Sequence, residues 1–200
     1  MIALVEGNTL GTNGVAFSGS PSSCGNCVGM FINPRFSTNS TITVRGNTIQ
    51  GMNGSAIYVQ PGEDTSYNVN TIITGNLIRQ PSTTNAVALD LRNGVSGAPV
   101  EGAGGCHAIT LGGSVTPGAW PSNTANAKNR IEGDWGTATT NNEVILLQTD
   151  SSLFKLVGYT SGDVRTFVQN NNSITSAALN GSGFNVTSVG TISTAGTSCP

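Results

Sequence analysis

The sequence predicts an all-β chain wound into a parallel β-solenoid, on three grounds. First, a Gly-Asn step with an aliphatic residue two positions after the asparagine recurs along the chain. Second, a short apolar alternation follows each copy after a polar gap. Third, only 9% of the residues are charged, while Gly, Asn, Ser and Thr are abundant. Short strand, Gly-Asn turn, short strand and variable loop form the pattern of stacked repeats.

The repeated steps and the strands after them can be placed along the chain. The copies are Gly7-Asn8-Thr9-Leu10, Gly46-Asn47-Thr48-Ile49 and Gly75-Asn76-Leu77-Ile78, with a weaker echo at Asn129-Arg130-Ile131. The alternations that follow are residues 15–17, 56–59, 87–91 and 144–147. Their period of two and their β-branched residues favour strands. We expect ten side chains to point inward and to stack on equivalents about 4.8 Å away in the next turn: Val44, Ile49, Ile57, Val59, Ile72, Ile73, Ile78, Val87, Leu89 and Leu91.

The asparagines of these steps are predicted to share one corner of the solenoid. Asparagine, like glycine, tolerates left-handed backbone angles, and stacked side-chain amides can hydrogen-bond to one another. The alternative is that Gly-Asn pairs are ordinary turn dipeptides. Asparagines 8, 47, 76 and 129 lie 39, 29 and 53 positions apart. This irregularity indicates loops of different length or an unrecognised turn, for which residues 108–111 are the candidate.

The pattern changes near residue 150. Residues 153–159 and 164–168 are interpreted as strands with hairpin-like turns, and residues 173–180 and 184–194 follow as a sparse alternation. So few apolar residues form a marginal core alone, so this part would be stable if three copies shared an axis. We therefore predict a parallel β-helix over 1–149 and a β-rich C-terminal oligomerisation region over 150–200. The alternative is a flexible tail.

No long helix is predicted anywhere, and the best short candidate is residues 123–128. The abrupt opening at Met1 suggests a fragment of a longer helix, because a solenoid must cap its first turn. The alternative is a native start whose edge a partner chain covers.

Charge and hydropathy argue against several classes of partner. The eight cations and ten anions are scattered, so no basic stripe indicates nucleic-acid binding. No run of about 18 apolar residues predicts a membrane span, and residues 1–10 do not form a signal peptide.

The chain resembles a known family at this level. The repeats over residues 1–147 are similar to the right-handed parallel β-helix of the pectate-lyase-like superfamily. With the tail over residues 150–200, the whole resembles the C-terminal part of a bacteriophage tailspike or tail fibre. The segments that carry this resemblance include residues 129–133, 152–158 and 190–194. It implies a homotrimer in the virion or outside the cell that binds, and sometimes cleaves, bacterial surface polysaccharide.

Cleavage of a glycan would use paired carboxylates, about 5–5.5 Å or 6.5–9.5 Å apart. Glu132 and Asp134 would share a face of an extended segment and are the catalytic candidates. Trp135 follows them, and an aromatic ring beside acids suits a sugar. The predicted carbohydrate-binding residues are Trp135, Trp120, Asp90 and Arg92. The alternative is that these are surface ion pairs and turn-capping acids.

The four cysteines leave several possibilities. Cys24 and Cys27 form a C-x-x-C, and Cys106 precedes His107, the one histidine. A Cys₃His zinc site is conceivable, but adjacent Cys and His ligands are awkward for one metal, so we predict no metal and no cofactor. The other interpretation is a 24–27 disulfide or free thiols, with Cys106 buried and Cys199 in a frayed terminus. His107 is predicted to be a polar surface or interface residue.

Three functions remain open at this stage. The first is a tailspike-like module that binds host surface polysaccharide. The second is a polysaccharide lyase or glycosidase, which would show a carboxylate pair at catalytic separation in an open cleft. The third is a secreted bacterial adhesin of similar fold, favoured if the 24–27 pair is oxidised and no trimer forms.

Overall fold

The computed structural model describes most of the chain. The described residues are 1–11, 28–34, 39–52, 55–61, 67–80, 87–93, 105–133, 143–149, 153–175, 185–189 and 192–200. Within them the protein is mostly β, with fifteen strands and one short helix. No helix in this part of the chain is long and apolar enough to cross a membrane.

The strands form three five-stranded sheets, and every strand pairing is parallel. Sheet A contains β1 (Ile2–Glu6), β4 (Asn39–Arg45), β7 (Asn68–Thr74), β10 (Cys106–Leu111) and β13 (Phe154–Leu156). Sheet B contains β2 (Thr9–Leu10), β5 (Thr48–Gln50), β8 (Leu77–Gln80), β11 (Arg130–Gly133) and β14 (Ser173–Thr175). Sheet C contains β3 (Met30–Ile32), β6 (Ile57–Val59), β9 (Leu89–Asn93), β12 (Glu143–Thr149) and β15 (Asn185–Val189).

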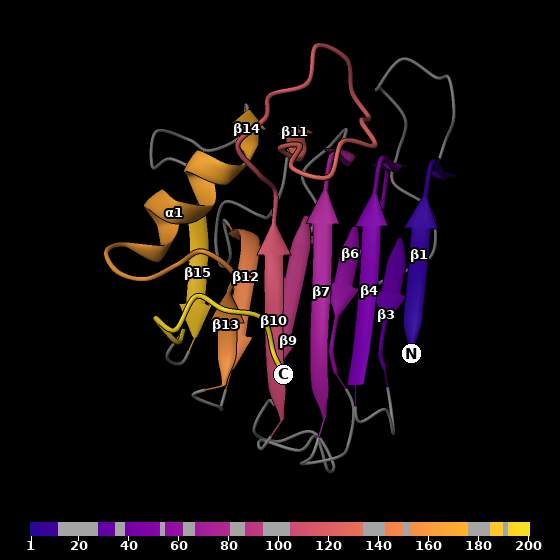
Figure 1. Cartoon of the computed structure of the whole chain (residues 1–200). Helices are drawn as coiled ribbons and strands as arrows, with labels where there is room; N and C mark the ends of the chain where they lie inside the picture. Colours follow the sequence, from indigo (N-terminus) through magenta and orange to yellow (C-terminus); the bar gives the residue numbers. More distant parts are fainter. Residues whose placement is uncertain are drawn as a thin grey trace.

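Each sheet takes every third strand, so the chain visits sheets A, B and C in turn five times (Figure 1). We call each set of three consecutive strands a circuit. Strands β13, β14 and β15 extend the same three sheets as the strands before them. Thus strands on both sides of residue 150 share hydrogen-bond ladders, while a division of the chain into two domains there stays a prediction.

Equivalent side chains of successive circuits stack inside. In sheet B, Ile49 lies in register with Ile78, and Ile78 with Ile131, and all three are fully buried. Eight of the ten predicted inward residues are buried. Ile72 is only partly buried, because its neighbour Ile73 points inward and successive strand residues face opposite sides. Val87, just before β9, is also partly buried.

The predicted asparagine ladder is present. The side-chain amide of Asn8 donates to Oδ1 of Asn47 at 3.1 Å, Asn47 donates to Asn76 at 3.0 Å, and Asn76 donates to Asn129 at 3.0 Å. Asn129 in turn donates to Asn172 at 2.9 Å, a fifth member that the sequence pattern missed. Since amides buried without partners are costly, this ladder stabilises the shared corner.

Glycine supplies left-handed backbone at this corner. Gly7, Gly46 and Gly75 each precede a ladder asparagine and have φ of 69°, 62° and 66°. Gly112 and Gly158 take the same place after β10 and β13, with φ of 75° and 89°. The last two are separated from their asparagines by insertions. The long spacing between Asn76 and Asn129 therefore reflects longer connections within one circuit, and residues 108–111 belong to β10 of that circuit.

The second insertion contains the helix α1 (Val164–Asn171), which corrects the predicted strand over residues 164–168. The side chain of Asp163 caps it by accepting hydrogen bonds from the backbone amides of Arg165 and Thr166. Val164, Phe167 and Val168 pack on the core at the spacing of one helix face. Residues 123–128, the helix candidate, contain a turn and an isolated bridge.

The last described residues run over the outside of sheet A. The backbone amide of Ser193 donates to the carbonyl of Phe154 at 2.8 Å, and the amide of Gly158 donates to the carbonyl of Gly196 at 2.7 Å. Farther on, Cys199 exchanges hydrogen bonds with the side chain of Asn70 in both directions. The C-terminus is therefore fastened, and the predicted frayed terminus around Cys199 is wrong.

Candidate functional site

A row of side chains crosses the outward face of sheet C. Phe31 lies in register with Tyr58, and Tyr58 with Asp90. The residues on either side of each member are more buried and turn toward the core, so alternation directs the row outward.

The first two members form an aromatic stack. The ring centroids of Phe31 and Tyr58 are 5.0 Å apart, and the planes are inclined by 28°. Phe31 is 55% exposed, which is unusual for a phenylalanine. The stack thus presents a flat apolar surface to solvent.

Arg92 joins this stack to Asp90. Its Nε and Nη2 donate to the two carboxylate oxygens of Asp90, each at 2.8 Å. Its guanidinium carbon lies 4.9 Å from the ring centroid of Tyr58, within the range of a cation–π interaction. The sequence correctly placed Asp90 and Arg92 on one face, but Asp90 is only 6% exposed, so this is a partly buried bidentate pair and not an exposed ion pair.

Gln60 holds the hydroxyl end of the Tyr58 ring in place. The hydroxyl of Tyr58 donates to Oε1 of Gln60, whose side chain is buried. We call Phe31, Tyr58, Gln60, Asp90 and Arg92 the sheet C cluster. Its rings and polar groups are held in place before any ligand arrives, which lowers the entropic cost of binding.

The sheet C cluster combines an exposed apolar ring surface with oriented polar groups. The C–H face of a sugar ring can stack on an aromatic ring, and amide, guanidinium and carboxylate groups can bind its hydroxyls. The carboxylate of Asp90 is already engaged by Arg92. The arrangement is therefore suited to binding rather than to bond cleavage.

Trp120 lies apart from the sheet C cluster. It belongs to the connection of residues 112–129 between β10 and β11, where it is partly buried. Residues on both sides of it, Ala119 and Pro121, line an open groove of about 580 Å³. The structure thus places two of the predicted carbohydrate-binding residues together, Asp90 and Arg92, and separates Trp120 from them.

Glu132, a predicted catalytic residue, is held between two arginines on the outward face of sheet B. Its carboxylate forms ion pairs with Arg79 of β8 and, at 2.7 Å, with Arg130 of its own strand. Both carboxylate oxygens of Glu132 are therefore engaged by arginine side chains, an arrangement typical of an ion-pair ladder. Asp134 and Trp135 lie outside the described residues, so their part in a site stays a prediction.

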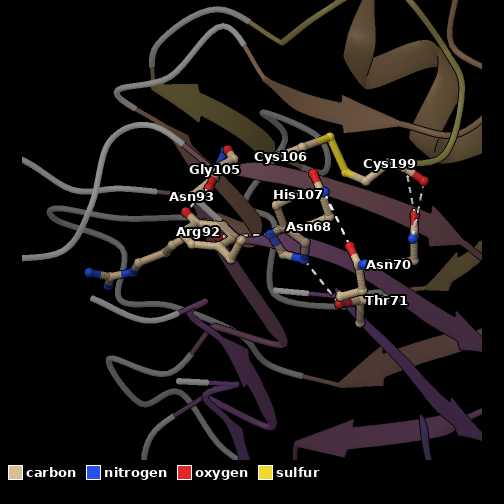
Figure 2. Close-up of a disulfide and its surroundings, with 11 residues drawn as sticks. Asn68, Asn70, Thr71, Arg92, Asn93, Gly105, Cys106, His107 and Cys199 are labelled. Atoms are coloured by element: carbon tan, nitrogen blue, oxygen red, sulfur yellow. Dashed lines mark hydrogen bonds between the residues drawn. A yellow bond between two sulfur atoms is a disulfide. The ribbon is translucent and has the colours of Figure 1, made fainter. Parts of the chain in front are cut away.

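His107 is buried, which corrects the predicted surface location. Its Nδ1 lies 2.9 Å from the carbonyl oxygen of Arg92, and its Nε2 lies 3.0 Å from the hydroxyl of Thr71 (Figure 2). Because a carbonyl only accepts, Nδ1 carries the proton and Nε2 accepts from Thr71. Burial lowers the pKa of His107 to about 4, so the ring is neutral at neutral pH. His107 thus links sheets A and C inside the core.

Cys106 forms a disulfide with Cys199, 93 positions later (Figure 2). Cys106 is buried as expected, but neither thiol is free, so Cys106 cannot serve as a ligand of the conceivable zinc site. Cys24 and Cys27 lie outside the described residues. Within the described part, no group of three or more His, Cys, Asp or Glu side chains could hold a metal ion.

Sequence reasoning missed Phe31, Tyr58 and Gln60 as site residues. A signal was present: if residues 57–59 are aligned with residues 89–91, Tyr58 falls beside Asp90. Phe31 offers less signal, because it stands in a three-residue strand.

Comparison with known proteins adds no relative. No protein-family model matches the chain, and no curated protein or solved structure matches it.

Proposed function

We propose that this chain is a carbohydrate-binding module of the phage-tailspike type, built on a right-handed parallel β-helix, that recognises bacterial surface polysaccharide through the sheet C cluster. The three parallel sheets, each taking every third strand, support the β-helix. The buried asparagine ladder at one corner supports it further. Right-handed connection is the default for parallel strands.

The observation that carries the proposed binding role is the joining of an exposed aromatic stack to an oriented guanidinium–carboxylate pair. An apolar platform alone would also fit a protein partner. The polar groups at its edge favour a ligand that has both a flat apolar face and many hydroxyls, and a sugar ring has both.

Binding of the chain to an array of bacterial surface polysaccharides tests this role. We expect Phe31→Ala and Tyr58→Ala to weaken binding of at least one retained glycan about tenfold or more, which corresponds to about 1.4 kcal/mol. Val115→Ala is the control, because Val115 is also an exposed apolar residue, 44% exposed, but lies in the connection between β10 and β11. If no glycan is retained, or if Val115→Ala weakens binding as much, the proposal is wrong.

Assembly as a homotrimer is part of the proposal. Five side chains of strands β1, β4 and β7 face outward on sheet A: Ile2, Leu4, Thr41, Thr43 and Ile72. These side chains are uncharged, and Ile2 is 89% exposed, which supports a subunit contact on this face. Light scattering on the full chain should give three times the mass of one chain. A monomer would leave glycan binding possible and would refute the trimer.

The described carboxylates support binding rather than cleavage. Glu6, Asp90 and Glu132 pair with arginines, and Asp163 caps α1. One observation favours a second candidate, a secreted adhesin of the same fold: the Cys106–Cys199 disulfide suits an oxidising location outside the cell. A glycan-binding monomer would favour the adhesin over the virion protein.

A further inference from the structure

We infer that the groove between the connection of residues 112–129 and the glycine corner of the first two circuits is a second binding site, for an uncharged ligand rich in hydroxyls such as a neutral oligosaccharide. This site is separate from the sheet C cluster and does not depend on it.

The connection that forms one wall is an ordered feature of the fold. At its base, the backbone amide of Val115 donates to the carbonyl of Asn126 at 2.9 Å, and the amide of Lys128 donates to the carbonyl of Val115 at 2.8 Å. Farther out, the amide of Ser122 donates to the carbonyl of Gly75 at 2.8 Å. Figure 1 shows the connection extending from the end of β10 over the ends of β7 and β4. The wall is therefore fixed to the sheet corner at its base and at its middle.

The connection covers the glycine corner of the second and third circuits but not that of the first. A Cβ atom at Gly75 would lie 1.8 Å from the carbonyl oxygen of Ser122, and one at Gly46 would lie 1.7 Å from Oδ1 of Asn123. A Cβ atom at Gly7 would meet nothing within 4 Å. The corner is thus covered at Gly75 and Gly46 and open at Gly7, and this opening makes the groove.

The groove has the size of a ligand site. Its volume is about 580 Å³, with Gly7 and Gly46 on one side and the segment between Pro117 and Thr124 on the other. Pockets that hold small ligands usually measure about 300–1,000 Å³. An open groove of this volume can hold part of an extended chain.

The lining favours a neutral, hydroxylated ligand. None of the lining residues carries a charge. Ser122, Asn123 and Thr124 offer hydroxyl and amide groups, and Pro117 and Pro121 offer small apolar surfaces. An anion would find no cation in this lining, whereas a neutral pyranose has hydroxyls for the polar groups and a C–H face for the prolines.

The test is a glycan array that carries matched neutral hexose oligosaccharides and hexuronate oligosaccharides, with wild-type protein and two blocking variants, Gly118→Trp and Ala119→Trp. A Cβ atom at Gly118 meets nothing within 4 Å, so the larger side chain can be accepted there. Because Gly118 and Ala119 both line the groove, we expect an indole at one or both positions to narrow it. Ala125→Trp is the control, since it adds the same bulk to an exposed position of this connection outside the lining.

We expect wild type and Ala125→Trp to retain a neutral oligosaccharide that at least one blocking variant loses by tenfold or more. Tyr58→Ala should leave this binding unchanged, which separates the groove from the sheet C cluster. The inference is overturned if no neutral oligosaccharide is retained, if the blocking variants bind as wild type does, or if Tyr58→Ala alone removes all glycan binding.

Discussion

The side-chain amide of Asn129 donates a hydrogen bond to Oδ1 of Asn172 at 2.9 Å, although 43 positions and the helix α1 separate the two residues. Asn129 also donates to the carbonyl of Ile73 and accepts from both the backbone and the side chain of Asn76. The ladder therefore keeps the fourth and fifth circuits in register with the third, even where an insertion interrupts the chain at the same corner.

Replacing Asn129 by Ala should destabilise the protein strongly. The substitution removes four hydrogen bonds from a fully buried amide and takes the acceptor away from the backbone N–H of Asn76. At about 1 kcal/mol each, we expect a loss of about 3–4 kcal/mol in the free energy of unfolding, measured by urea denaturation. Asn8→Ala is the control, because Asn8 is exposed at the end of the ladder, and it should cost less than about 1 kcal/mol. Equal effects would contradict a continuous ladder.

Gly75→Ala should destabilise the protein more than Gly7→Ala. The two glycines have nearly the same φ, 66° and 69°, so both substitutions carry a similar backbone strain of about 1–2 kcal/mol. Only at Gly75 would the new Cβ atom collide with a backbone carbonyl, that of Ser122. Thermal unfolding of both variants measures the difference. An equal decrease in Tm would show that the carbonyl of Ser122 does not pack closely against Gly75.

The ladder could be predicted at the three Gly-Asn steps and at the weaker echo around Asn129, but not at Asn172. In the first three circuits the positive-φ glycine directly precedes the ladder asparagine. Between Gly158 and Asn172 the chain inserts α1, so no Gly-Asn dipeptide marks the fifth corner. Residues 164–168 also fit a strand, because Val164, Phe167 and Val168 are good strand residues, and the signal for a helix there is the Asp163 cap.

The candidate site was predictable only within a strand. Period-two alternation is a local property, and it placed Asp90 and Arg92 on one face. The register between strands is not local: Phe31, Tyr58 and Asp90 become neighbours only when three circuits align. The same holds for Cys106 and Cys199, which meet because the last residues return across sheet A.

The stability of the protein should fall as the pH decreases from about 6.5 to about 4, because of His107. The folded-state pKa is lowered to about 4, so the unfolded state takes up a proton first. A group of this kind contributes its full stability above pH 6.5 and loses it through this window. The difference of about 2.5 pH units corresponds to about 3 kcal/mol.

Urea denaturation between pH 5 and pH 7 measures this slope. His107 is the one histidine of the chain, so no other imidazole titrates there. In His107→Gln the slope should flatten in this window, even if the overall stability is lower. A variant that keeps the wild-type slope would show that another group causes it.

Removing the Cys106–Cys199 disulfide should lower the free energy of unfolding by about 2–4 kcal/mol, because the bond closes a loop of 93 positions and thereby restricts the unfolded chain. The double variant Cys106→Ser and Cys199→Ser should reproduce the effect of a thiol reductant on this bond. Since Cys24 and Cys27 remain in the double variant, any further decrease in stability when reductant is added to it reports on those two residues alone. Without the disulfide, the hydrogen bonds between residue 199 and Asn70 should also weaken. We expect the backbone amide of residue 199 to exchange its hydrogen faster in the double variant than in the wild type. If exchange there stays slow and stability is unchanged, backbone contacts such as the hydrogen bond from Ser193 to Phe154 fasten the C-terminal residues without the disulfide.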